Sequence, residues 1–156
     1  MTQRVGYIRK ISGPVIIARG LRDVRLGEVV EIGVEGLIGE VVRISDDLFT
    51  IQVYESTSGI KPGDPVRATG KILVAELGPG LLGSIFDGVQ RPLKEILKRV
   101  GYFIRRGVKV NALPRDKKWY FKPIVKPGTL VEGGDIIGVV QETSIIEHKI
   151  MIPPTI

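Results

Sequence analysis

Few residues of this chain have the types and spacing that chemistry requires, and the most suggestive are glycines. Gly78–Gly83 fits the G-x-G-x-x-G pattern and follows an apolar run. In dinucleotide-binding folds such glycines let a pyrophosphate approach the start of a helix, and an acidic residue about twenty positions later binds the ribose. Here Gly88 and Pro92 interrupt any helix that follows, and residues 96–115 contain no Asp or Glu. The pattern therefore predicts a structural turn.

The same glycines also lie at the spacing of a phosphate-binding P-loop. That loop needs a Lys after its last glycine to neutralise phosphate charge, and then a Ser or Thr for magnesium. The chain has Ser84 and Ile85 at these two positions, and the full pattern G-x-x-x-x-G-K-[ST] occurs nowhere in it. We expect no nucleotide to bind this stretch in the P-loop manner.

Few residues of the chain could support other catalytic chemistry or bind a metal. The chain has no Cys and one His, which excludes a thiol nucleophile, a Cys-ligated zinc and a site with several histidines. His148 lies in a predicted strand, where a hydrogen-bonded structural histidine is favoured over a catalytic base. We predict no catalytic, cofactor-binding or metal-ligating residue in these 156 residues.

Residues 125–140 resemble biotinyl and lipoyl carrier domains, because Val125–Gly128 and Gly134–Gly138 match the two turns of those sandwiches. Carrier domains hold their acceptor lysine on a hairpin soon after the second turn. The nearest candidate, Lys149, follows Asp135 by fourteen residues in a run without hairpin signals. The shape is expected to be carrier-like without the chemistry, and a carrier domain remains an alternative.

Charge is concentrated in one segment. The chain has a net charge of +6, yet residues 91–126 contain twelve Lys or Arg against two Asp or Glu, a net charge of +10. Such a segment is either a solvated surface or a docking face for an acidic partner. The candidate docking residues are Arg115, Lys117, Lys118, Lys122 and Lys126. Trp119, Tyr120 and Phe121 lie among them and could stack on bases, although mixed core and surface packing is favoured.

The elements that would position these residues are mostly short strands. Gly and Pro make up 30 residues, and Val and Ile runs alternate with turns, which is typical of a mainly β chain. We predict an N-terminal β-barrel over residues 1–76, a Gly-rich connector over 77–106 and a second small β unit over 107–156. The expected barrel strands cover 5–11, 15–18, 29–32, 37–44, 48–54, 66–69 and 72–75. One helix should run from Pro92 to Gly101, and the expected later strands cover 108–110, 119–121, 124–125, 136–140 and 145–152.

The longest run without charge spans ten residues, half the length of a membrane-spanning helix, and no secretory signal precedes it. The sequence therefore predicts a soluble intracellular chain with no direct membrane insertion.

Several motifs together resemble the N-terminal portion of the catalytic A subunit of archaeal and vacuolar-type rotary ATPases. The most specific is the connector Glu76–Leu93, with the sequence ELGPGLLGSIFDGVQRPL. Shorter matches are Ser12–Val15, Gly39–Ile44, Gln52–Gly63, Arg105–Gly107, Lys117–Trp119 and His148–Pro154, so that the resemblance runs nearly from end to end.

This resemblance implies a layout and a role. Residues 1–76 would be the barrel that joins alternating A and B subunits in a ring, and residues 107–156 the bulge, of a barrel-sandwich type. The parent would make or hydrolyse ATP coupled to proton or sodium transport, and it would be held at the cytoplasmic side of the membrane through the assembled complex. ATP or ADP and magnesium would bind beyond Ile156, so this stretch is expected to be non-catalytic. A peripheral stalk would be one acidic partner for the basic segment.

A nucleic-acid-binding barrel is the remaining alternative, because small barrels bind oligonucleotides. The sequence argues against it, since residues 1–77 have no net charge and the positive charge lies outside the predicted barrel. We expect no nucleic acid among the partners.

Overall fold

The computed structural model describes residues 4–154, which form two compact units. The chain up to Val74 belongs to the first unit together with Val100–Lys109, and Ala75–Arg99 belongs to the second with the chain from Val110 onward. Residues 100–109 thus pack with the first unit, although they begin at the last residue of the helix, most of which belongs to the second. The expected divisions after residues 76 and 106 remain predictions about domains.

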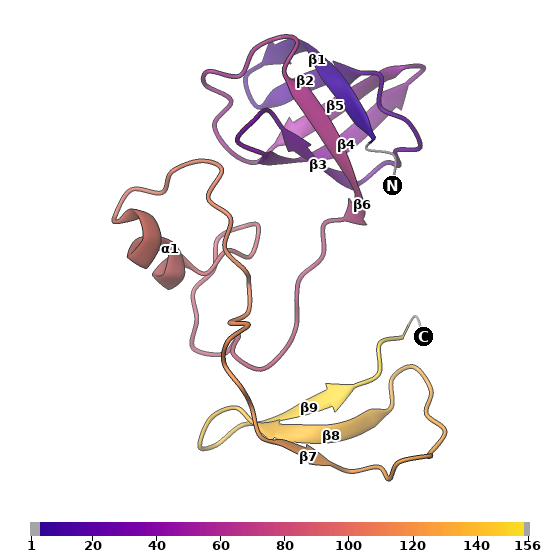
Figure 1. The fold of residues 1–156 in the computed structure, drawn as a ribbon, viewed down its shortest axis with the longest axis vertical. Coiled ribbons are helices and arrows are strands. Elements are labelled where there is room, and N and C mark those ends of the chain that lie inside the picture. The colour runs from indigo at the N-terminus through magenta and orange to yellow at the C-terminus, as the bar shows by residue number, and fades with distance from the viewer. Residues whose placement is uncertain (1–3, 155–156) are drawn as a thin grey trace. The chain divides into compact units, whose positions relative to one another are not determined.

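The first unit is a closed barrel of six antiparallel strands in the order β1-β2-β5-β4-β3-β6 (Figure 1). Closure pairs every strand on both sides and leaves no open edge. The strands are β1 (Val5–Ser12), β2 (Val15–Arg19), β3 (Glu28–Ile32), β4 (Leu37–Ser45), β5 (Leu48–Val53) and β6 (Pro65–Ile72).

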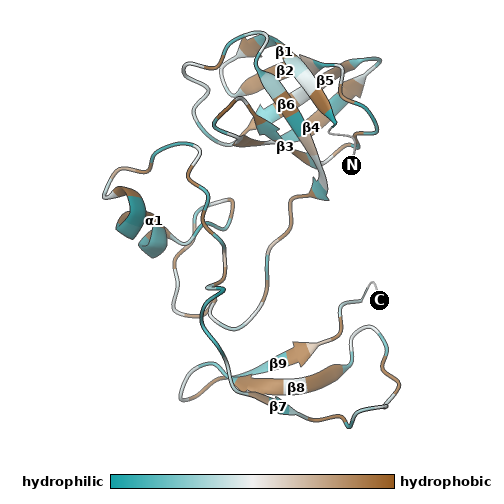
Figure 2. Ribbon diagram, viewed as in Figure 1, coloured by the Kyte–Doolittle hydropathy of each residue, from teal (hydrophilic) through white to brown (hydrophobic). Residues whose placement is uncertain are grey.

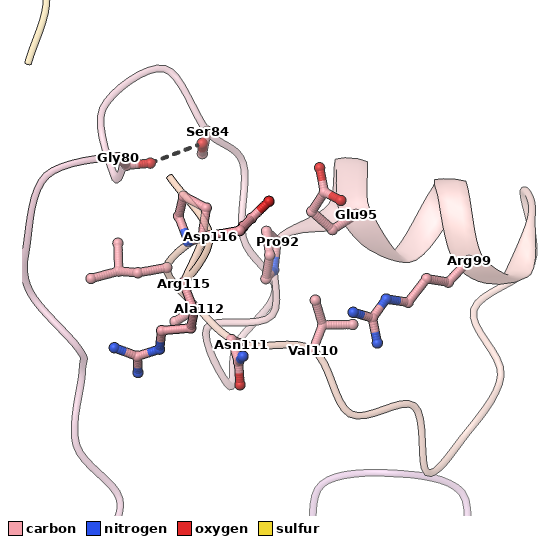
Figure 3. Close-up of a pocket in the computed structure, with 12 residues that line it drawn as sticks. Gly80, Ser84, Pro92, Glu95, Arg99, Val110, Asn111, Ala112, Arg115 and Asp116 are labelled. Carbon is pink, nitrogen blue, oxygen red and sulfur yellow. Dashed lines mark hydrogen bonds between the residues drawn. The ribbon is translucent and has the colours of Figure 1, made fainter. Parts of the chain in front are cut away.

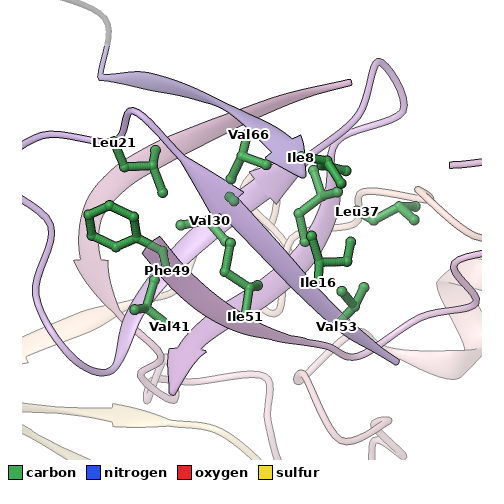
Figure 4. Packing of buried hydrophobic residues seen from close by; sticks show 12 residues of the cluster. Ile8, Ile16, Leu21, Val30, Leu37, Val41, Phe49, Ile51, Val53 and Val66 are labelled. Atoms are coloured by element: carbon green, nitrogen blue, oxygen red, sulfur yellow. The ribbon is translucent and has the colours of Figure 1, made fainter. Parts of the chain in front are cut away.

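Alternating apolar residues fill the barrel. In β5, Phe49, Ile51 and Val53 are buried while the residues between them are not, as the sequence pattern predicted. The cluster in Figure 4 combines such rows from all six strands. A side chain at Gly39 in β4 would lie 2.7 Å from Ile32 Cδ1, so close packing requires glycine there.

The sequence predicted two strands where the structure has the single strand β6, and a bulge explains the difference. Gly70 interrupts the apolar pattern because it lies at the bulge, with φ +78°. The buried carboxylate of Glu28 accepts hydrogen bonds from the Gly70 N–H and from Arg4 Nη2, both at 2.7 Å. This carboxylate thereby holds the bulge in place, and its two hydrogen bonds offset the cost of burying its charge.

The second unit contains one helix and one small sheet. Helix α1 (Leu93–Val100) follows Pro92 and ends before Gly101, as predicted, and buries Ile96. The sheet has the order β7-β8-β9, with strands β7 (Phe121–Pro123), β8 (Ile136–Gln141) and β9 (Glu147–Met151). Figure 2 shows β8 as hydrophobic over most of its length.

Some predicted strands are wrong. Residues 108–110 form no strand, because no strand pairs with their backbone; the side chain of Lys109 forms an ion pair with Glu31 of β3. The strand predicted at 119–121 begins only at Phe121, and 124–125 is not a strand. The fold class is nevertheless confirmed: a mainly β chain with an N-terminal barrel, one short helix and a second small β unit.

Candidate functional site

The glycine-rich loop of the connector is closed by a carboxylate. Glu142, which follows β8, accepts hydrogen bonds at Oε1 from the Gly80 N–H at 2.7 Å and from the Leu82 N–H at 3.2 Å. Converging backbone N–H groups of this kind also hold phosphates. Here the protein's own side chain takes the place that an anion would occupy.

His148 in β9 completes this arrangement. Its Nδ1 lies 2.9 Å from Glu142 Oε2, and the Glu142 side chain is only 2% exposed. Burial opposes ionisation of this carboxyl, but the hydrogen bonds from Gly80, His148 and Leu82 outweigh it and lower the pKa of Glu142. The geometry gives His148 a structural partner, which is the role that the sequence favoured.

The loop is further fixed by apolar packing. A side chain at Gly78 would lie 2.8 Å from Leu113 Cδ1, and one at Gly80 would lie 3.3 Å from the Pro114 ring. Gly80 also has φ +108°, a conformation that only glycine adopts easily. These glycines therefore serve a turn and a close approach of chain segments.

A second turn, over residues 87–91, is equally self-contained. Asp87 Oδ1 accepts the N–H groups of Val89 and Arg91, and Oδ2 pairs with Arg91 Nε at 2.7 Å. Burial opposes ionisation of Asp87, yet its bonds to Arg91 and Val89 outweigh burial and lower the pKa of this carboxyl. The side-chain amide of Gln90 exchanges two hydrogen bonds with the backbone of Glu76.

The second unit has a cavity of about 300 Å³ between α1 and residues 110–116 (Figure 3). Charges of both signs line it, from Glu95 and Arg99 on the helix and from Arg115 and Asp116 opposite. Glu95 pairs with Lys98, and Arg115 pairs with Glu76. The cavity offers no concentration of one charge that would select a phosphate or a cation.

The basic segment carries less free charge than its composition suggests. At least five of its cations are paired within the chain: Arg91 with Asp87, Lys98 with Glu95, Arg106 with Glu35, Lys109 with Glu31 and Arg115 with Glu76. The last three of these pairs could not be predicted from sequence spacing, because their partners are 39 to 78 residues apart in the chain.

The predicted docking residues are all exposed, and their surroundings differ. Arg115 is paired with Glu76, and the Lys117 ammonium lies 3.7 Å from the centre of the Trp119 ring. Lys118 and Lys126 are exposed in segments outside the strands. Lys122 of β7 lies opposite Val139 of β8, which in turn lies opposite Lys149 of β9.

Lys149 therefore lies on the same face of the sheet as Lys122. The sequence did not predict this proximity, because it depends on the register of the strands. Sequence reasoning also missed Glu142, for which no local motif gives a signal. Lys149 lies within β9 rather than on a hairpin. Among the described residues, no group of three or more His, Asp or Glu side chains is placed to hold a metal ion, and no helix is long and apolar enough to cross a membrane.

Comparison with known proteins agrees with this fold. Residues 8–70 match the ATP synthase alpha/beta family, beta-barrel domain, and residues 110–156 match the ATP synthase alpha/beta subunit barrel-sandwich domain. A closed barrel followed by this second β unit defines the class: the chain belongs to the ATP synthase alpha/beta family.

Within that class, the relatives are A subunits of A-type ATP synthases and alpha chains of V-type ATP synthases. The chain is 66% identical to the A subunit of the A-type ATP synthase of Thermofilum pendens over 151 residues, which are 97% of this chain and 25% of the relative. It is 58% identical to the corresponding A subunit of Methanopyrus kandleri over 149 residues, 96% of this chain and 25% of the relative. It is 57% identical to the V-type ATP synthase alpha chain of Thermoanaerobacter sp. (strain X514) over 151 residues, 97% of this chain and 26% of the relative.

The chain thus spans about a quarter of the length of the curated relatives that it matches. The resemblance to the N-terminal portion of the A subunit of A-type and V-type enzymes is confirmed.

Proposed function

We propose that this chain is the assembly and interaction portion of the catalytic A subunit of a rotary ATPase. The parent protein makes or hydrolyses ATP coupled to proton or sodium transport, and these residues themselves bind no nucleotide. The observation that carries the proposal is the match of 97% of the chain to an A subunit, together with a closed barrel in the family's barrel domain.

The geometry of the connector supports the non-catalytic part of the proposal. A phosphate would have to displace the Glu142 carboxylate from the Gly80 and Leu82 N–H groups, and Ser84 stands where a P-loop has its lysine. ATP or ADP and magnesium would instead be held by other parts of the parent protein. Calorimetric titration of the chain with MgATP should give no binding heat, and micromolar binding would overturn this part.

Assembly is the second part. In the parent, the barrel would join B subunits in an alternating ring, on the cytoplasmic side of the membrane to which the complex is bound. The chain mixed with the B subunit of the same organism should form a complex that elutes ahead of both components in size-exclusion chromatography with light scattering. Separate elution at micromolar concentrations of each would count against this role.

The basic residues provide the third part, a docking face for an acidic partner such as a peripheral stalk. Replacing Lys117, Lys118 and Lys122 by Gln should weaken stalk binding and flatten its dependence on salt, because screening acts on exposed charges. The matched control removes three exposed charges from the barrel: Lys10, Arg43 and Lys61. Equal effects of the two triple variants, or no effect of the first, would contradict docking at this face.

A further inference from the structure

The segment that leaves α1 returns to the barrel and is held there by three glutamates. Arg106 Nη2 donates to Glu35 Oε1 at 2.7 Å, and Lys109 pairs with Glu31. The Gly107 N–H lies 3.2 and 3.3 Å from the two carboxylate oxygens of Glu55. All of these residues belong to the first unit, and each contact joins positions 52 to 78 residues apart in the chain.

The glutamates come from neighbouring parts of the barrel. Glu31 lies in β3, Glu35 in the turn between β3 and β4, and Glu55 just after β5. Gly36 and Gly59 complete the surface that receives the segment. We call these five residues the acidic notch.

Glycines on both sides fix the shape of this contact. A side chain at Gly59 would lie 3.3 Å from Arg106 Nη2, and one at Gly36 would lie 3.2 Å from Lys109 Nζ. In the segment itself, Gly107 has φ +71°, and a side chain there would lie 3.1 Å from the Glu35 carbonyl oxygen. The notch therefore selects the sequence Arg-Gly and does not merely attract positive charge.

The two ion pairs of this contact are weak. The Arg106 and Lys109 side chains are 29% and 58% exposed, and ion pairs in such positions add little stability and are screened by salt. Arg106 Nη1 is buried without a hydrogen-bond partner among the described residues, which costs part of the gain. The connection of the segment to the barrel favours the contact, because it gives the segment a high effective concentration.

We propose that the acidic notch is a binding site for an Arg-Gly-x-Lys segment, filled reversibly in this structure by residues 106–109 of the same chain. A basic segment of another polypeptide with the same Arg-Gly sequence would compete for the notch once the chain's own segment is released. This proposal does not depend on the role of the parent protein.

The test uses the full 156-residue chain and a synthetic peptide of residues 102–111. In the variant Arg106→Ala/Lys109→Ala, the peptide should shift the backbone NMR signals of Glu35, Gly36 and Gly59 in a saturable manner, in about the millimolar range expected for a weak site. In the unchanged chain the same peptide concentration should shift them little, because the notch is occupied. Absence of saturable shifts in the variant, or equal shifts in both proteins, would overturn the proposal.

Two controls separate recognition from simple attraction. A peptide with Ala in place of Gly107 keeps the same charge, and it should bind at least about fivefold more weakly because of the Glu35 contact. The chain variant Arg105→Ala loses a neighbouring charge but keeps the notch filled, so it should behave like the unchanged chain. Equal binding of the two peptides would reduce the notch to a patch of negative charge.

Hydrogen exchange in the unchanged chain tests reversibility without any substitution. The Gly107 amide should lose protection by about threefold or more between 0.1 M and 1 M salt, as the screening length falls from about 10 Å to about 3 Å. The Ile51 amide, inside the barrel, should be unaffected. Constant protection of Gly107 would contradict a reversible contact held by charge.

Discussion

Glu142 determines what the glycine-rich loop can do. A loop with converging N–H groups resembles a phosphate cradle in sequence, but in this fold Glu142 already satisfies Gly80 and Leu82. The carboxylate is buried, and removing it would leave the Gly80 and Leu82 N–H groups and His148 without this hydrogen-bond partner. The loop and the second sheet are thereby joined through one side chain.

Glu142→Ala should destabilise the second unit by about 1 kcal/mol, because the half-buried Gly80 N–H and the exposed Leu82 N–H lose their acceptor. Hydrogen exchange at the Gly80 and Leu82 amides should become faster in the variant. Glu147→Ala removes an exposed carboxylate from β9 and should leave both amides unchanged. Unchanged exchange in Glu142→Ala would show that the loop is held by its apolar packing alone.

Lowering the pH should destabilise the second unit, because two of its carboxyl groups are more acidic in the folded chain than in the unfolded chain. The pKa values of Glu142 and Asp87 are lowered in the folded chain, so each group binds its proton more weakly than in the unfolded chain. Their contribution is fully present above the unfolded values of about 4.3 and 3.9 and is lost as pH falls through the folded values. Urea unfolding between pH 7 and pH 3 should show this loss, and Glu142→Gln/Asp87→Asn should flatten the curve below about pH 4.5. An equally steep curve in the double variant would exclude these groups as its cause.

At the scale of elements, alternation and turn residues were sufficient to predict the barrel. Phe49, Ile51 and Val53 alternate with polar residues, and such alternation fixes the register of a strand when one of its faces is buried. The strand predicted at 108–110 is wrong. Apolar residues around Lys109 suggested it, but a strand also needs a second strand to pair with, and the local sequence does not reveal whether one is present. Side-chain partners such as Glu142 could not be predicted, since they depend on contacts between distant positions.

Helix α1 offers a matched pair of substitutions. Ile96 is 1% exposed, whereas its neighbour Leu97 is 43% exposed. Ile96→Ala should cost about 2–4 kcal/mol through lost burial and a cavity, and Leu97→Ala should cost less than about 1 kcal/mol. Thermal unfolding followed by circular dichroism measures both. Similar costs for the two variants would mean that α1 does not anchor the second unit through Ile96.

At the scale of the whole chain, the two units differ in the size of their cores. Twelve buried apolar residues form the cluster inside the barrel, from Ile8 to Val66. The second unit fully buries only three large apolar side chains among the described residues, Ile96, Val139 and Val140, and polar contacts such as those of Glu142 and Asp87 supplement its apolar packing. Since apolar burial is the main stabilising contribution, the barrel should be the more stable unit.

Unfolding in urea should therefore depart from a single transition, with the second unit unfolding first. Ile51→Ala, which empties part of the barrel core, should lower the midpoint of the later transition, and Ile96→Ala that of the earlier one. The hydrogen-exchange protection of residues 100–109 should survive the earlier transition, because their contacts to Glu31, Glu35 and Glu55 lie within the first unit. Coincident transitions by fluorescence of Trp119 and by circular dichroism, moved equally by both substitutions, would show instead that the two cores unfold as one.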